Sequence, residues 1–253
     1  MNLKNTLKAF APNFLLQAYR FMKRTYFPQR AFSTPSYSQN GEDILLNHLF
    51  CREQNGFYVD VGAHHPLRFS NTYILYKRGW RGINIDAMPG SMRAFENFRK
   101  RDINIECGVG GVNAESVNVE NANKGGGLEF YVFKEGAYNT FDANLAKQYQ
   151  NYSKLIKQVV IPILPLHTIL DTYLPKNQQI SFFSIDCEGL DLQVLRSNNF
   201  EKYRPKIIVV EIASKNLEDI LHCETTQFLQ SQGYELFQKL HISVFYKDTK
   251  AKL

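Results

Sequence analysis

The sequence predicts an α/β fold with an open, mostly parallel β-sheet that ends in an antiparallel hairpin. Two short apolar runs, 57–62 and 82–86, are rich in β-branched and aromatic residues and end on a glycine or a carboxylate, as buried parallel strands do at a sheet edge. Similar runs alternate with helical patterns on both sides of the middle of the chain. The last two strands, 234–239 and 242–246, have almost no connector, so they must pair antiparallel.

The first half of the chain predicts a βαβαβ unit preceded by a helix. Its strands are expected at 57–62, 82–86 and 103–109. Ligands of an open parallel sheet bind just outside the carboxyl ends of its strands, so we expect the ligand site where these strands end. The helices of this half are expected at 41–52, 71–78 and 89–100.

The same alternation resumes after residue 180. Strands at 180–186 and 206–212 are each followed by a helix, at 189–198 and 217–231. The segment between the two halves, 112–165, breaks the rhythm and is interpreted as a β-rich insertion beside the ligand site. Its expected pieces are short strands at 116–119, 128–133 and 158–164, a loop at Gly125–Gly127 and a helix at 142–152.

The net charge of +6 is confined to the start of the chain. Residues 1–41 contain six basic residues and no acid, and the remaining 24 basic residues balance all 24 acidic ones. A neutral body argues against a nucleic-acid-binding face. The six basic residues are Lys4, Lys8, Arg20, Lys23, Arg24 and Arg30.

Residues 1–37 are predicted to form a basic helical arm and linker ahead of one domain at 38–253. Apolar residues recur near helical spacing over 3–24, broken at Pro12, and 25–38 has the prolines and serines of a linker. The arm either packs on the domain or on a second copy in a homo-oligomer, or residues 1–24 contact an anionic membrane surface. It has neither the cleavage site of a secretory signal nor a membrane-spanning apolar run.

The four cysteines are scattered and include no C-x-x-C pair. Neither a zinc site nor a disulfide framework is indicated, so a reducing cytoplasm is the expected location. The cysteines are Cys51, Cys107, Cys187 and Cys223.

The loop after the first strand favours S-adenosylmethionine (SAM) over a dinucleotide cofactor. Gly62 is the only glycine of the three that a dinucleotide fingerprint requires. A carboxylate at Asp60 would repel a pyrophosphate but suits the sulfonium and ammonium groups of SAM. Asp86, at the end of the second strand, is placed to accept both ribose hydroxyls of a nucleoside.

Six short motifs occur in order along the chain and together resemble the FkbM-type family of SAM-dependent methyltransferases. The resemblance covers about 36–247. It implies a class I methyltransferase (Rossmann-like) fold and methyl transfer to a hydroxyl, typically of a sugar or another polyhydroxylated metabolite. The motifs are Ser38–Asp43, Asp60–Ala63, Ser70–Thr72, Asn139–Phe141, Ser184–Leu195 and Ile208–Glu211.

The resemblance also implies cofactor-binding residues. Asp60 and Gly62 would line the methionine end of SAM, and Asp86 would hold the ribose. Relatives often have asparagine where this chain has His64–His65, so the role of that loop stays open. The other implied residues are Ala87 and Met88 beside the adenine, Gln39, Ser70 and Asn71 closing the pocket, and Cys107.

Three carboxylates are expected to converge near the ends of the two central strands. Asp186 and Glu211 each end a predicted strand, and Glu188 follows two residues after Asp186. Their mutual repulsion is relieved either by a divalent cation such as Mg²⁺ or Mn²⁺, or by a raised pKa that makes Glu188 a general base. The structural alternative is that Asp186 caps a helix and Glu211 pairs with a buried cation. His64 is a further candidate base or ligand.

These observations predict a cytoplasmic SAM-dependent O-methyltransferase. Its expected acceptor is a sugar hydroxyl on a nucleotide-linked sugar, made for a capsule or another surface polysaccharide. A natural-product or lipid-linked acceptor is an alternative. So are an NAD-dependent nucleotide-sugar oxidoreductase and a catalytically inactive scaffold recruited to the membrane by its arm.

Overall fold

The computed structural model describes residues 12–111, 127–214 and 216–252. The chain divides into two compact units, Met1–Ser36 and Tyr37–Leu253. In the first unit, helix α2 (Asn13–Tyr26) follows Pro12, and the rest of the predicted arm helix lies outside the described residues. The segment expected to be only a linker contains a short helix, α3 (Pro28–Phe32). Pro28 suits the start of that helix, because the first helical position needs no N–H for an intrahelical hydrogen bond and proline has none.

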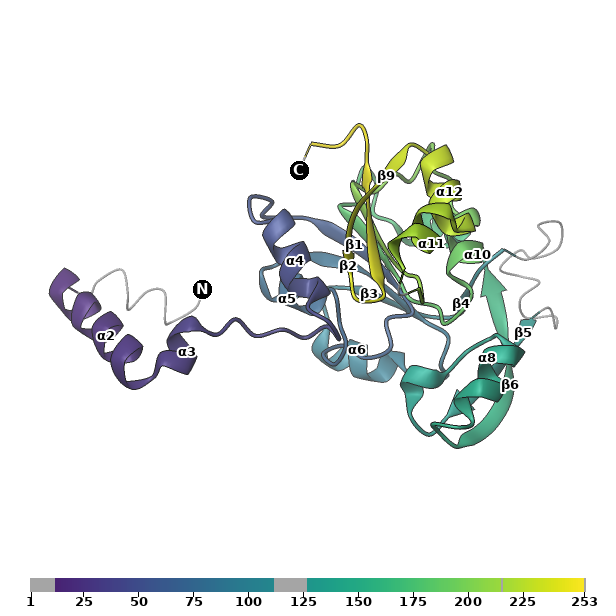
Figure 1. Cartoon of the computed structure of the whole chain (residues 1–253), viewed down its shortest axis with the longest axis horizontal. Coiled ribbons are helices and arrows are strands. Elements are labelled where there is room, and N and C mark those ends of the chain that lie inside the picture. The colour runs from purple at the N-terminus through teal and green to yellow at the C-terminus, as the bar shows by residue number, and fades with distance from the viewer. Residues whose placement is uncertain (1–11, 112–126, 215, 253) are drawn as a thin grey trace. The chain divides into compact units, whose positions relative to one another are not determined.

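Figure 1 shows the strands and helices of the second unit. Its main sheet has seven strands in the order β3-β2-β1-β7-β8-β10-β9. The first five of these strands pair parallel, and β10 pairs antiparallel with both β8 and β9. Strand order reverses between β1 and β7, which is where open α/β sheets bind ligands. This arrangement confirms the predicted fold class. The strands are β1 (Phe57–Val61), β2 (Arg81–Asp86), β3 (Ile103–Glu106), β7 (Phe182–Ile185), β8 (Ile207–Glu211), β9 (Tyr234–Leu240) and β10 (Ser243–Asp248).

Helices cover both faces of this sheet, and alternate strand residues point into two separate cores. Val59 of β1 packs with residues of α9, α10, α11 and α12 on one face. Tyr58 packs with residues of α4 and α5 on the other, as the two-residue period of a strand requires. The helices of this unit are α4 (Glu42–Leu49), α5 (Tyr73–Lys77), α6 (Met92–Phe98), α8 (Ala143–Tyr149), α9 (Leu166–Tyr173), α10 (Asp191–Arg196), α11 (Leu217–His222) and α12 (Glu224–Ser231).

Two predicted elements are divided in the structure. The helix expected at 217–231 is broken at Cys223, whose extended backbone (ψ 156°) ends α11 and starts α12. The strand expected at 103–109 is split into β3 and β4 (Gly108–Val109), which belong to different sheets. A Cβ on Gly108 would lie 2.3 Å from Ile163 Cδ1, so glycine permits the chain to leave the main sheet and pair with β6 (Leu155–Leu164).

The middle of the chain forms a second, three-stranded sheet with the order β4-β6-β5. Strand β5 (Gly127–Phe133) pairs antiparallel with β6 (Leu155–Leu164). Gly127 therefore begins a strand and does not belong to a loop, whereas Gly125, Gly126 and the strand expected at 116–119 lie outside the described residues. The 3₁₀ helix η1 (Gly136–Tyr138) and α8 lie between β5 and β6 in the chain.

Candidate functional site

A cavity of about 800 Å³ opens at the carboxyl ends of β1, β2, β7 and β8. The second sheet and the elements after β5 supply its other wall, through side chains such as Phe130, Phe141 and Tyr149. The cavity therefore lies where the strand order predicts a ligand site. Six of the predicted cofactor-binding residues line it, namely Gln39, Gly62, Asp86, Ala87, Met88 and Cys107.

Asp86 is held by the two loops that follow β1 and β2. Its Oδ2 accepts a hydrogen bond from the His64 amide at 2.9 Å, and its Oδ1 accepts one from the Met88 amide at 2.8 Å. Burial raises the pKa of this carboxyl, although the hydrogen bonds from the two backbone amides oppose the shift. Each oxygen keeps a further lone pair for a ligand hydroxyl. The carboxylate is thus fixed at the cavity wall in a geometry suited to a vicinal diol.

Gly62 is required for close packing of two strand ends. Its φ is +80°, and a Cβ at this position would lie 1.7 Å from the carbonyl oxygen of Asp186. Packing within the protein is thus a requirement for glycine at this position, besides the predicted contact with the methionine end of SAM. The missing side chain first allows the end of β1 to contact the residue after β7, which brings the cofactor loop beside the carboxylates.

Asp186, Glu188 and Glu211 form what we call the carboxylate cluster. One oxygen from each lies within 4.8 Å of the others. Carboxylates this close together repel one another unless a proton, a cation or a ligand offsets their charge. Burial and the charges of Glu211 and Glu188 raise the pKa of Asp186 well above its usual range, although its side chain is open to the cavity.

Glu188 is held by two residues from the segment that connects β5 and β6. Its backbone has a φ of +45°, in the left-handed region, and its carbonyl accepts a hydrogen bond from Thr140 Oγ1 at 2.7 Å. The Tyr149 hydroxyl donates to Glu188 Oε2 at 2.6 Å. Burial raises the pKa of Glu188 to about 7, and the hydrogen bond from Tyr149 limits that rise. Glu188 is thus a carboxyl whose proton exchanges near neutral pH.

Neither structural role considered for these carboxylates is present in the described residues. Helix α10 has no side-chain cap, and the Cys187 and Gly189 amides donate to Asp191, not to Asp186. Across 12–111, 127–214 and 216–252, no basic side chain forms an ion pair with Glu211 or its two neighbours. Hard oxygen donors at this spacing fit a divalent cation, which would lower the pKa of a bound hydroxyl.

His64 lines the cavity but lies outside the carboxylate cluster. Burial lowers the pKa of its imidazole, although the charge of Asp86 opposes the shift. The described side chains close enough to share a cation include no histidine. Its ring stacks near Phe69, and its backbone amide holds Asp86. The geometry thus connects His64 with the cofactor loop, and its role as base or ligand stays a prediction.

Asp60, Ser70 and Asn71 were expected at the cofactor, but they do not line the cavity. Asp60 has the same parity in β1 as Tyr58, so its side chain points to the α4–α5 face. There Asp60 accepts a hydrogen bond from Thr72 at 2.9 Å. Asn71 donates to Ser184 Oγ at 3.1 Å. These three side chains are thus engaged within the protein beside the site.

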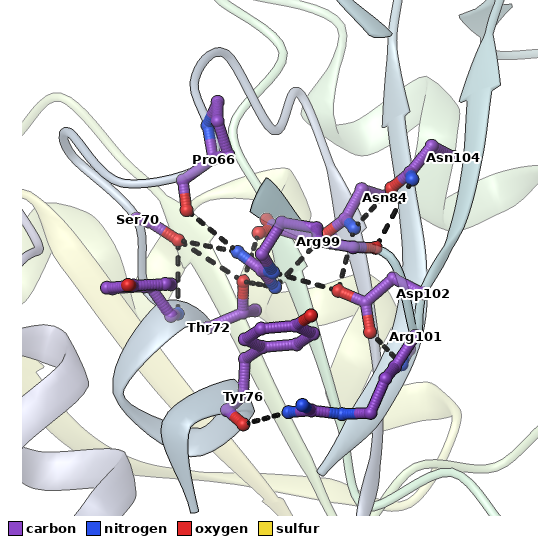
Figure 2. A network of polar contacts seen from close by, with 12 residues as sticks. Pro66, Ser70, Thr72, Tyr76, Asn84, Arg99, Arg101, Asp102 and Asn104 are labelled. Atoms are coloured by element: carbon purple, nitrogen blue, oxygen red, sulfur yellow. Dashed lines mark hydrogen bonds and ion pairs between the residues drawn. The ribbon is translucent and has the colours of Figure 1, made fainter. Parts of the chain in front are cut away.

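Arg99 is the centre of a buried polar network, shown in Figure 2. Its guanidinium is fully buried and forms an ion pair with Asp102, with 2.9 Å between Nε and Oδ2. It also donates to the Tyr58 hydroxyl at 2.7 Å and to Thr72 at 2.9 Å. We call this the Arg99 network; its members are Tyr58, Asp60, Ser70, Thr72, Asn84, Arg99 and Asp102.

An open sheet of this order, with a cavity at its strand-order reversal and an acid at the end of β2, is the architecture of a methyltransferase. Residues 60–236 match the family described as the methyltransferase FkbM domain. The chain therefore belongs to the FkbM methyltransferase family, as the sequence motifs predicted. A search of curated proteins gave no significant match.

The sequence did not predict roles for Tyr149, Thr140 or Arg99. Thr140 lies in one of the shared motifs, which signalled importance without a contact. Arg99 and Tyr149 gave no signal, because their contacts with Tyr58 and Glu188 join residues that are 41 and 39 positions apart in the chain.

Proposed function

We propose that the protein is a SAM-dependent O-methyltransferase that methylates a sugar hydroxyl on a nucleotide-linked sugar for capsule or other surface polysaccharide synthesis. The observation that carries this proposal is the position of the carboxylate cluster. Three carboxylates without a partner cation among the described residues share one cavity with the loops after β1 and β2. Such a cluster suits a polyhydroxylated ligand, because carboxylates accept hydrogen bonds from several hydroxyls at once.

The cofactor half of the cavity fits a nucleoside with a cationic tail. When bound, SAM supplies an electrophilic methyl group. Asp86 would accept the ribose hydroxyls, and Met88 with Ala87 would contact the adenine. The carboxylate cluster lines the same cavity, and its negative charge favours the sulfonium and ammonium of SAM over a pyrophosphate. The family assignment and this charge distribution both disfavour the NAD-dependent oxidoreductase.

Basic side chains line the cavity as well as acids. Arg68 and Lys134 line the cavity and are exposed. Arg68 also forms an ion pair with Glu135 at 3.1 Å. A phosphorylated or nucleotide-linked sugar would place its hydroxyls on the carboxylate cluster and its phosphates near these cations. A neutral sugar has no group for the cations, which favours the nucleotide-linked acceptor.

Two routes to deprotonation of the acceptor hydroxyl are compatible with the carboxylate cluster. Glu188 is a suitable general base, since its pKa of about 7 permits it to take a proton at neutral pH. Alternatively, Asp186, Glu188 and Glu211 would hold a divalent cation that acidifies the hydroxyl. In both routes the protein orients the nucleophile toward the methyl group, and this orientation lowers the barrier.

The decisive experiment measures methyl transfer from labelled SAM to a panel of nucleotide sugars, with SAM binding measured separately by calorimetry. We expect SAM binding and turnover on at least one nucleotide sugar. Parallel reactions contain EDTA, with and without excess Mg²⁺ or Mn²⁺. Loss with EDTA and recovery with metal would establish the cation route, and indifference to EDTA would support Glu188.

Other outcomes separate the alternatives. Turnover only on lipid-linked sugars or on natural products would keep the methyltransferase and overturn the nucleotide-sugar acceptor. SAM binding without turnover on any of these acceptors would support an inactive scaffold. Absence of SAM binding would overturn the cofactor assignment itself.

A further inference from the structure

We propose that helix α2 binds an anionic membrane surface and lies in the plane of the lipid headgroups. This inference concerns residues 13–26 and does not depend on the methyl transfer proposed above. No described helix is long and apolar enough to cross a bilayer, and the 14 residues of α2 span only about 21 Å. Membrane contact through α2 must therefore be peripheral.

Seven of the eight apolar side chains of α2 share one face. At 100° per residue these seven occupy an arc of about 160°, with Leu16 outside it, and α2 has no buried residue. Phe14, Phe21 and Tyr26 are 68%, 69% and 71% exposed. An arc this wide exceeds the narrow seam of a coiled coil and suits insertion between headgroups. The arc consists of Phe14, Leu15, Ala18, Tyr19, Phe21, Met22 and Tyr26.

Apart from Leu16, the opposite face of α2 is polar and basic. Arg20, Lys23 and Arg24 lie on this side together with Asn13 and Gln17, and residues 1–41 contain no acid. A helix that only packs on protein needs solubility on its outer face, which mixed charges provide as well. A polar face with cations alone is instead complementary to anionic lipid headgroups.

Charge also favours lipid over the protein's own catalytic unit as the occupant. Residues 42–253 contain equal numbers of basic and acidic residues, so this unit offers no excess of negative charge. A second copy docked through the same arc would leave the basic face without an acidic partner, since residues 1–41 contain no acid. An anionic bilayer alone satisfies both the apolar arc and the cations.

The test is co-sedimentation of the full chain with lipid vesicles at low and high salt. We expect binding to vesicles of equal parts phosphatidylcholine and phosphatidylglycerol, at least tenfold stronger than to phosphatidylcholine alone, and weaker at high salt because exposed charges are screened. Combining F14S with F21S, or R20E with R24E, should reduce this binding at least tenfold. The matched control is L217S, an equally drastic change at a side chain 58% exposed on α11, which should bind as the parent does.

Three results would overturn the proposal. One is equal binding to both kinds of vesicle; another is unchanged binding of the α2 variants. The third is failure of the parent chain to bind vesicles while F14S with F21S lowers the thermal stability or dissociates an oligomer, because the arc would then pack on protein. Methyl transfer is measured without vesicles in each variant, so that a failed acceptor assignment is not confused with a failed membrane site.

Discussion

The Arg99 network and the carboxylate cluster both contain carboxylates from the main sheet, but the two groups of carboxylates differ in whether a cation lies beside them. Asp60 and Asp102 are buried beside a guanidinium that donates to six groups. Among the described residues, no basic side chain forms an ion pair with Asp186, Glu188 or Glu211. A carboxylate beside a basic side chain has its charge balanced within the fold. A carboxylate without one still needs a proton, a metal ion or a ligand to balance its charge. The lack of a partner cation among the described residues, more than the presence of acids, therefore distinguishes the candidate site.

The largest expected effect is the loss of stability when Arg99 is replaced in the Arg99 network. Arg99→Met leaves Asp102 and Asp60 buried without compensation, and we expect a loss of about 3–5 kcal/mol in the free energy of unfolding. Chemical denaturation measures it. The control is Arg101→Met, since Arg101 is an exposed cation near the same loop that contacts the Tyr76 carbonyl. Equal losses in the two variants would contradict a structural role for the network. Tyr58→Phe, a milder change, should cost about 1 kcal/mol.

The opposite result is expected when a carboxylate of the cluster is neutralised. Glu211→Gln removes repulsion within the cluster, so stability should be unchanged or higher while turnover falls at least about a hundredfold. Steady-state kinetics, SAM calorimetry and denaturation are measured on the same preparation. A variant with normal turnover but weakened SAM binding would move Glu211 to the cofactor side. A large loss of stability would make the cluster structural.

Most of the fold followed from local patterns, because buried strands and amphipathic helices depend on residues that are close in sequence. The strands β1, β2, β7 and β8 and the terminal hairpin were predicted within a few residues. Helix α9 was not predicted, although Leu166, Ile169 and Leu170 have helical spacing, since it follows directly after a strand and Pro165. The transfer of Gly108 to a second sheet depends on Ile163, a contact that no local pattern contains.

The candidate site was predictable only where strand geometry determines it. Parallel strands end at one edge, so the approach of Asp186 to Glu211 followed from their positions at two strand ends. The direction of Asp60 depends on strand parity, which places it on the face opposite to Val59 and Val61. Tyr149 comes from the second sheet's connection, and its contact with Glu188 requires tertiary packing that spacing does not encode.

Asp86 allows the cofactor assignment to be tested apart from the carboxylate cluster. Asp86→Ala should weaken SAM binding by about 1–3 kcal/mol through lost hydrogen bonds to the ribose. Calorimetry measures it. Glu96→Gln, on the exposed side of the neighbouring α6, is the control and should leave SAM affinity unchanged. Unaltered affinity in Asp86→Ala would remove Asp86 from the ribose site. Part of any loss could come from the His64 loop, so Asp86→Asn is the conservative comparison.

The smallest expected effect concerns the pH dependence of turnover. If Glu188 is the base, the rate rises with pH through about 7, because the carboxylate must be unprotonated to accept the hydroxyl proton. The hydrogen bond from Tyr149 stabilises the charged form, so Tyr149→Phe should move this midpoint upward by about one pH unit.

The stability of the protein should show the same group with the opposite sign. A carboxyl whose pKa is raised by folding favours the folded state while it is protonated, so this contribution is lost as the pH rises through about 7. Denaturation at several pH values measures it, and in Glu188→Gln the corresponding decline should be absent. A bound divalent cation would instead keep all three carboxylates ionised and move the rate midpoint well below 7. A pH–rate midpoint near 7 that shifts in Tyr149→Phe therefore supports Glu188 as the base. A midpoint well below 7, with turnover that EDTA abolishes, supports the cation.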